Sequence, residues 1–202
     1  MAFSGRNLTC TRGGRTVFRD LTFDVAAGAA LLLRGPNGSG KSSLLRMAAG
    51  FLPPAAGHFA WDGNPATADD LRARVAWVGH ADATKAAFTV AENAAFWIRL
   101  GGGDSSATGR ALASMGIDHL ADLPAGVLSA GQRRRLNLCR LAAGAAPLWL
   151  LDEPTSSLDD ASVTGLIAML QQHLDRGGAL VVATHVDLPL RPSATLSLGA
   201  SR

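Results

Sequence analysis

The sequence predicts an α/β domain in which helices cover a parallel β-sheet. Short apolar runs recur along the chain, and each has the length and composition of a strand buried on both faces: 29–34, 75–78, 148–151 and 179–184. Segments with apolar residues at helical spacing lie between these runs. Alternation of strand and helix is typical of a parallel sheet, because each return connection between parallel strands needs a crossover.

Length and composition fit one folded domain. The chain has 202 residues, of which 48% are hydrophobic and 17% charged, and this balance is typical of a globular protein with a substantial core. The net charge is +3 at pH 7, and the basic side chains are almost all arginine, because Lys41 and Lys85 are the only lysines. Such a small charge does not by itself indicate nucleic acid, and it suits an anionic membrane surface equally well.

Cysteine usage and hydropathy exclude several other classes of protein. Cys10 and Cys139 lie far apart without a Cys-x-x-Cys pair, which favours reduced thiols in the cytoplasm over a disulfide framework or a zinc site. The N-terminal residues contain no apolar stretch of signal-peptide length. No run approaches the ~18 consecutive apolar residues that a membrane helix needs, so we expect a soluble chain.

Further elements are expected around the sheet. Alternating polar and apolar residues predict an antiparallel hairpin at 8–25 and another strand pair near 58–62. Residues 101–106 are expected to form an open loop. Helical spacing predicts helices at 42–49, 92–100, 107–115, 131–143 and 161–174. We therefore predict a single domain, 1–202, with a core at about 1–86 and 141–202 and a helical insert at about 87–140.

A glycine-rich loop lies between the first buried strand and a helix. Residues 35–42 read Gly-Pro-Asn-Gly-Ser-Gly-Lys-Ser, which matches the G-x-x-x-x-G-K-S pattern of a phosphate-binding loop. Glycines let the backbone N–H groups turn towards the phosphates, and the helix N-terminus adds positive potential. In this pattern the lysine reaches the β- and γ-phosphates, and the serine after it binds Mg²⁺. We therefore predict an ATP and Mg²⁺ site formed by Gly35, Pro36, Asn37, Gly38, Ser39, Gly40, Lys41, Ser42 and Ser43.

Two adjacent carboxylates follow the apolar strand at 148–151. Ligands bind at the carboxyl ends of parallel strands, so Asp152 and Glu153 are expected at the edge of the sheet that binds the nucleotide. We predict that Asp152 holds Mg²⁺ through water and that Glu153 is the general base that polarises the attacking water. A lone Asp-Glu pair would more often be a solvated strand end, but the phosphate-binding loop favours the catalytic interpretation.

Residues 128–132, Leu-Ser-Ala-Gly-Gln, precede a helix with an apolar face. With the phosphate-binding loop and the carboxylate pair, they resemble the LSGGQ signature of the ABC ATPase family, with Ala130 in place of the first glycine. The resemblance implies a RecA-like P-loop NTPase core with an N-terminal antiparallel β subdomain and an inserted helical subdomain. It also implies a head-to-tail dimer, in which Ser129, Gly131 and Gln132 of one copy contact the ATP held by the other. A plain helix N-cap is the alternative interpretation, since serine caps many helices.

Two further segments match the pattern of the ABC ATPases. Residues 156–159, Ser-Ser-Leu-Asp, resemble the D-loop, which crosses the dimer interface in that family. His185, after the last apolar run, resembles the switch histidine that contacts the γ-phosphate. The resemblance therefore implies a catalytic role for His185.

Two positions depart from that pattern. His80 stands, by its spacing from residues 89–93, where the family has a glutamine that reaches Mg²⁺ and the attacking water. Histidine changes charge near neutral pH, so any such role of His80 is expected to depend on pH. Arg12 aligns with the aromatic residue that stacks on adenine in the family. A guanidinium can also stack on a base, but a solvated turn residue beside a loosely held adenine is an equal alternative.

Residues outside the catalytic motifs narrow the resemblance. Gly79-His80 and the three arginines after the signature, 133–135, are similar to the ATPases of the cytochrome c maturation system, described as haem exporters. That resemblance implies a CcmB-like integral membrane permease as partner, docked near His80 and the helical insert. It also implies a peripheral position on the cytoplasmic face of the inner membrane, and no nucleic-acid partner is expected. We expect the three arginines to form a charged face near phosphate or carboxylates of a partner.

Two other functions stay open. The first is the ATPase subunit of an ABC transporter with a different substrate, which would share all the catalytic residues. The second, less favoured, is a soluble ABC protein acting on ribosomes or DNA. That class typically carries two cassettes in one chain or a long coiled-coil insertion, and this sequence shows neither.

Overall fold

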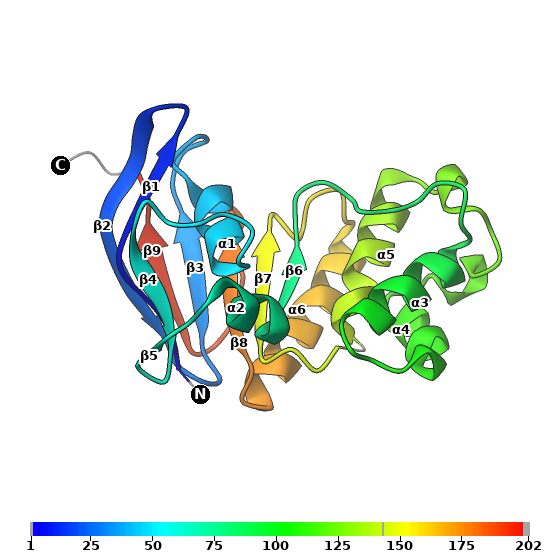
Figure 1. The fold of residues 1–202 in the computed structure, drawn as a ribbon. Helices are drawn as coiled ribbons and strands as arrows, with labels where there is room; N and C mark the ends of the chain where they lie inside the picture. Colours follow the sequence, from blue (N-terminus) through cyan, green and yellow to red (C-terminus); the bar gives the residue numbers. More distant parts are fainter. Residues whose placement is uncertain (1, 143, 200–202) are drawn as a thin grey trace.

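The computed structural model describes residues 2–142 and 144–199, which fold around two β-sheets (Figure 1). The antiparallel sheet has the strand order β2-β1-β4-β5. Its strands are β1 (Phe3–Arg12), β2 (Arg15–Val25), β4 (Ala56–Trp61) and β5 (Asn64–Pro65). The other sheet is parallel throughout, with the order β6-β7-β8-β3-β9. Its strands are β3 (Ala30–Arg34), β6 (Val75–Val78), β7 (Leu148–Asp152), β8 (Ala179–Ala183) and β9 (Ser193–Ser197).

Both faces of the parallel sheet are buried, which explains its continuous apolar runs. Leu31 and Leu33 of β3 pack with α1 (Lys41–Ala48) and the aromatic side chains of the antiparallel sheet. Leu32, between them, points to the opposite face and joins the core formed with α5 (Ala130–Ala142) and α6 (Asp160–Asp175). Because successive side chains of a strand alternate between faces, a strand between two cores needs apolar residues at every position. The predicted α/β class is confirmed.

The remaining helices lie in the segments between these elements. They are α2 (Ala68–Arg74), α3 (Val90–Leu100), α4 (Thr108–Ser114) and the short 3₁₀ helices η1 (Ser105–Ala107), η2 (Asp118–Leu120) and η3 (Ala125–Val127). Helices α3, α4 and α5 pack on one another and lie away from the antiparallel sheet, on the right in Figure 1. We call these three helices and their connections the helical lobe. The insert boundaries at 87 and 140 stay a prediction.

Most predicted helices and strands are present within one or two residues of their expected ends. Three differences have a physical reason. Helix α2 was not predicted, because it buries only Leu71 and so shows no apolar stripe. Strand β9 was not predicted either, because it is an edge strand with mainly exposed residues. The loop at 101–106 runs into η1, which Asp104 caps by accepting a hydrogen bond from the Ser106 N–H. The predicted end of the helix 131–143 lies outside the described residues.

In the part of the chain that the structure describes, no helix combines the length and the apolar character needed to span a bilayer.

Candidate nucleotide site

The glycine-rich loop joins β3 to α1 and turns where side chains would collide. Gly35, Gly38 and Gly40 adopt φ angles of 142°, 81° and 100°, a region that residues with a Cβ rarely enter. A Cβ on Gly35 would meet the carbonyl oxygen of Leu198, and one on Gly40 would lie 2.7 Å from Val17 Cγ1. The loop therefore lies between β2 and the residues after β9. Its backbone follows a path that the positive φ angles of the three glycines allow.

The polar groups of this loop fit a phosphate ligand. Lys41 is buried, and its Nζ donates to the carbonyls of Gly35 at 2.7 Å and Pro36 at 3.1 Å, across the loop. The Ser39 hydroxyl is buried without a hydrogen-bond partner. Gly40 starts α1 without a side-chain cap, so the first N–H groups of the helix stay available to an anion. The loop thus combines a cation, an unpaired hydroxyl and a helix N-terminus.

The carboxylate pair lies at the C-terminal end of β7. Asp152 is buried and pairs with Ala183 of the neighbouring strand β8. Glu153 has a positive φ of 48°, a conformation that costs about 1–3 kcal/mol in a non-glycine residue and recurs at functional sites. Its N–H donates to the Ala183 carbonyl at 2.8 Å. The strand pairing thus brings Glu153 level with the end of β8.

His185 meets this carboxylate from the end of β8. Its Nδ1 lies 3.0 Å from Oε1 of Glu153, and the Glu153 side chain is 15% exposed against 72% for His185. Arg34, at the end of β3, holds the same segment by donating to the Thr184 carbonyl at 3.0 Å and pairing with Asp187 at 2.8 Å. Two of the predicted catalytic residues, Glu153 and His185, are therefore in contact. The segment 184–187 that carries His185 is held to β3 by Arg34.

The Leu-Ser-Ala-Gly-Gln segment begins α5 with a capping box. The Ser129 Oγ accepts from the Gln132 N–H at 3.2 Å, and the Gln132 Oε1 accepts from the Ser129 N–H at 2.8 Å. A Cβ on Gly131 would lie 2.8 Å from the carbonyl oxygen of Ser157, so only glycine allows the close approach of the following loop. Ser129 therefore caps α5 within its own chain, and it is also exposed at the N-terminus of that helix.

Comparison with known proteins decides the family. A family model described as ABC transporter matches residues 18–156. The chain belongs to the ABC transporter family. Its ATPase activity follows from this membership.

Relatives and solved structures agree over almost the whole chain. The chain is 49% identical to the cytochrome c biogenesis ATP-binding export protein CcmA of Paramagnetospirillum magneticum, over 97% of this chain and 93% of that protein. The CcmA protein of Rhodospirillum rubrum is 48% identical, with 97% and 85% covered. A putative ABC transporter ATP-binding protein of Pyrococcus furiosus has a TM-score of 0.84 at 21% identity, covering 97% of this chain and 98% of that one. A bacterial Atm1-family ABC exporter with ATP bound has a TM-score of 0.82 at 23% identity, covering 98% and 36%. These two structures show the ABC ATPase fold.

The expectation for the three arginines is wrong for Arg134. This side chain is 3% exposed, and its guanidinium donates to backbone carbonyls of its own chain. The Arg133 guanidinium donates to the Leu128 carbonyl, and that of Arg135 lies 3.4 Å from the carbonyls of Met115 and Gly116. Arg134 is therefore an internal hydrogen-bond donor of the ABC ATPase and not part of a charged face.

Residues 89–93, from which the position of His80 was counted, have a structural role of their own. Thr89 and Glu92 form a capping box at the start of α3, and the buried Asn93 side chain hydrogen-bonds to the backbone of Lys85, Phe88 and Thr89. His80 lies before these residues, two positions after the C-terminal end of β6, and is exposed. His80 thus lies in the segment 79–89, which leads from β6 into α3. We call this segment the approach to the helical lobe.

Arg12 ends β1 in an exposed hairpin, where it pairs with Arg15. Val17 and Phe18 of β2 are the side chains that lie against Gly40 of the phosphate-binding loop. Neither residue was predicted to line the site, although the alternation of β2 breaks there with two adjacent apolar residues. The role of Arg12 at adenine stays a prediction.

Proposed function

We propose that this chain is the ATP-hydrolysing subunit of an export complex for cytochrome c biogenesis. The observation that carries the proposal is the 49% identity over 97% of the chain to a cytochrome c biogenesis ATP-binding export protein, CcmA. Relatives of that name match at 47–48% identity from several other bacteria. The phosphate-binding loop, the Asp152-Glu153 pair, the signature segment 128–132 and His185 are present in the chain, which supports an active ATPase and not a degenerate copy.

The chain's own residues can divide the chemistry of hydrolysis. The phosphate-binding loop and Lys41 would hold the β- and γ-phosphates. Glu153 would accept the proton of the attacking water as general base. His185, whose Nδ1 lies 3.0 Å from Glu153 Oε1, would orient that carboxylate and contact the γ-phosphate. Ser42 and Asp152 would hold Mg²⁺, which neutralises charge on the phosphates when bound. A hydroxyl at a helix start and a buried carboxylate are oxygen donors of the kind that Mg²⁺ prefers.

A second copy of the chain would complete each nucleotide site. Helix α1 follows the phosphate-binding loop beside β3, whereas α5 lies in the helical lobe beyond β6 and β7 (Figure 1). This separation supports contact between Ser129, Gly131 and Gln132 and the ATP of another copy, not of the same one. Ser129 is exposed at the start of α5, as a contact in trans requires.

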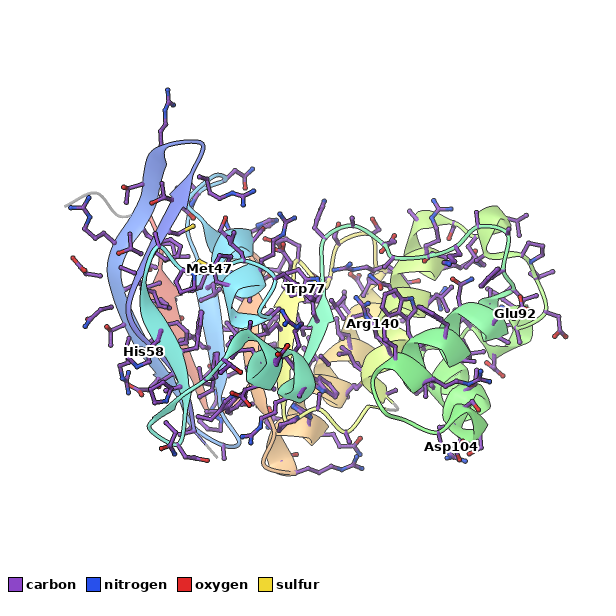
Figure 2. The ribbon with its side chains drawn as sticks, in the orientation of Figure 1. Met47, His58, Trp77, Glu92, Asp104 and Arg140 are labelled. Atoms are coloured by element: carbon purple, nitrogen blue, oxygen red, sulfur yellow. The ribbon has the colours of Figure 1, made fainter. Side chains whose placement is uncertain are left out.

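A membrane subunit similar to CcmB would dock at the approach to the helical lobe. Phe88 and Phe96 are exposed there, with the Lys85 ammonium 5.3 Å and 5.8 Å from their ring centres. Phe51 is also exposed and packs edge-on against Trp77, which Figure 2 places on β6 between α1 and the helical lobe. Exposed aromatic side chains of this kind favour an amphipathic helix as occupant. The ATPase would then lie peripherally on the cytoplasmic face of the inner membrane.

Co-purification in mild detergent from native membranes tests the assignment. We expect an integral protein of the CcmB type together with other cytochrome c assembly factors. Recovery of a different permease would leave the ATPase account intact and refute the cytochrome c assignment. Recovery only with ribosomes or DNA would refute the transporter assignment as well.

A further inference from the structure

The guanidinium of Arg134 joins two chain segments that are far apart in sequence. On one side it donates to the carbonyls of Asp152 at 2.9 Å, Glu153 at 2.8 Å and Pro154 at 3.3 Å. On the other side it donates to the carbonyl of Gly79 at 2.8 Å. One planar cation therefore fastens the backbone around the proposed general base to the backbone that leads from β6 into the helical lobe.

The segment 79–82, which follows β6, is held by the face of α5 that carries Arg134. Asp82 Oδ1 lies 3.7 Å from the Arg134 guanidinium and 3.4 Å from the Asn137 amide nitrogen, one turn further along the helix. Residues three apart on a helix share a face, so Arg134 and Asn137 act on Asp82 together. A displacement of the 79–82 segment would thus pull directly on the guanidinium.

We propose that Arg134 is a positioning residue that fixes the backbone of Glu153 and links it to the 79–82 segment. The proposal rests on the general-base role of Glu153 given above. Because the φ of Glu153 is positive, its carboxylate direction depends on partners that hold this conformation. The Glu153 carbonyl accepts from Arg134 and from the Ser156 N–H at 3.2 Å, and so the guanidinium is one of two donors at that point.

The charge of Arg134 is kept in the interior by these contacts. Burial lowers the pKa of Arg134, while the nearby carboxylates of Asp82, Asp152 and Glu153 raise it again. A lysine in its place has a single ammonium with three donors, and it lacks the planar fork that reaches carbonyls on both segments at once. Arg134→Lys therefore keeps a positive charge but releases one segment.

The experiment compares Arg134→Lys with Arg110→Lys, a control at an exposed arginine of α4, in steady-state ATP hydrolysis by the full chain. We expect kcat of Arg134→Lys to fall about 10- to 100-fold while KM for ATP stays within about threefold, because the general base is displaced and the phosphate-binding loop is untouched. The control should keep both constants near wild type. Melting temperatures measured alongside separate loss of folding from loss of positioning. If Arg134→Lys does not fold, Asp82→Asn takes its place, and a smaller loss of kcat at unchanged KM is expected.

A double-variant cycle with Glu153→Gln gives the decisive readout. If Arg134 acts through Glu153, adding Arg134→Lys to Glu153→Gln lowers the residual single-turnover rate by less than about twofold. A loss that multiplies in the double variant, or a KM that rises as much as kcat falls, overturns the positioning role. Wild-type turnover by Glu153→Gln alone would instead refute the general base, and with it the proposed chemistry.

Discussion

Nδ1 of His185 lies 3.0 Å from Oε1 of Glu153, although 31 residues separate the two along the chain. The contact exists because β7 and β8 are neighbours in the sheet, with Asp152 opposite Ala183. The imidazole restrains a carboxylate whose backbone already has an unusual conformation. This contact would orient Glu153 for its proposed role as general base.

His185→Ala should therefore slow hydrolysis more than binding. We expect kcat to fall about 10- to 100-fold, with little change in ATP affinity, since orientation and a γ-phosphate contact are lost together. Phosphate release and nucleotide binding measure the two effects. His58→Ala is the matched control, because His58 lies on β4 in the antiparallel sheet (Figure 2). An unchanged kcat for His185→Ala would remove the imidazole from the chemistry.

Replacement of His80 tests its role in the reaction. If the imidazole orders the attacking water or approaches Mg²⁺, His80→Ala should lower kcat by about 10-fold or more, because the water loses a polar partner. His80→Gln restores the residue that the family has at this position and should keep most of the activity. Both variants are measured at saturating Mg-ATP. An undiminished kcat in His80→Ala would exclude His80 from the reaction.

Asn93→Ala should destabilise the approach to the helical lobe. The Asn93 side chain accepts from the Lys85 N–H at 2.8 Å and donates to the carbonyls of Lys85 at 3.0 Å and Thr89 at 2.9 Å. Its loss removes these hydrogen bonds from part-buried backbone groups, and so we expect the free energy of unfolding to fall by about 2–3 kcal/mol. Chemical denaturation measures it, with the exposed Asn64→Ala as control. A fall below about 0.5 kcal/mol would contradict the tethering role.

His173 should make the fold less stable in acid. Burial against Trp149, with ring centres 3.8 Å apart, lowers the pKa of His173 from its usual 6.5. Below pH 6.5 the unfolded chain then binds a proton that the folded chain resists, so stability is complete above that pH and falls as pH decreases. His173→Phe keeps the stacked ring and should flatten this part of the curve of unfolding free energy against pH. An equally steep decline in the variant would assign the acid sensitivity to other groups.

The sequence predicted most of the fold because both faces of the parallel sheet are buried. Leu32 packs in one hydrophobic core, and its neighbours Leu31 and Leu33 pack in the other. The resulting continuous apolar run predicts a buried strand from the sequence alone. Helix α2 was not predicted, because Leu71 is its only buried residue. Strand order is set by contacts between distant segments, so the contact between Glu153 and His185 was not predicted, and the sequence indicated only a separate catalytic role for each.

Arg134 shows why part of the site was missed. Three consecutive arginines usually indicate a solvated face, and that interpretation was wrong for the middle one. Arg134 precedes the buried Leu138 and Leu141 by four and seven residues, so it lies on the same helical face as these core residues. That spacing was a readable signal, but the hydrogen-bond partners on two other segments were not.

The most direct test is the turnover and oligomeric state of Glu153→Gln with Mg-ATP. We expect the variant to bind ATP, to lose at least about 100-fold in turnover, and to accumulate as a dimer that forms only with nucleotide. Light scattering and phosphate release from the same sample measure both properties. Undiminished turnover would contradict the general-base role of Glu153, and a monomer that stays monomeric with bound ATP would contradict the shared nucleotide site.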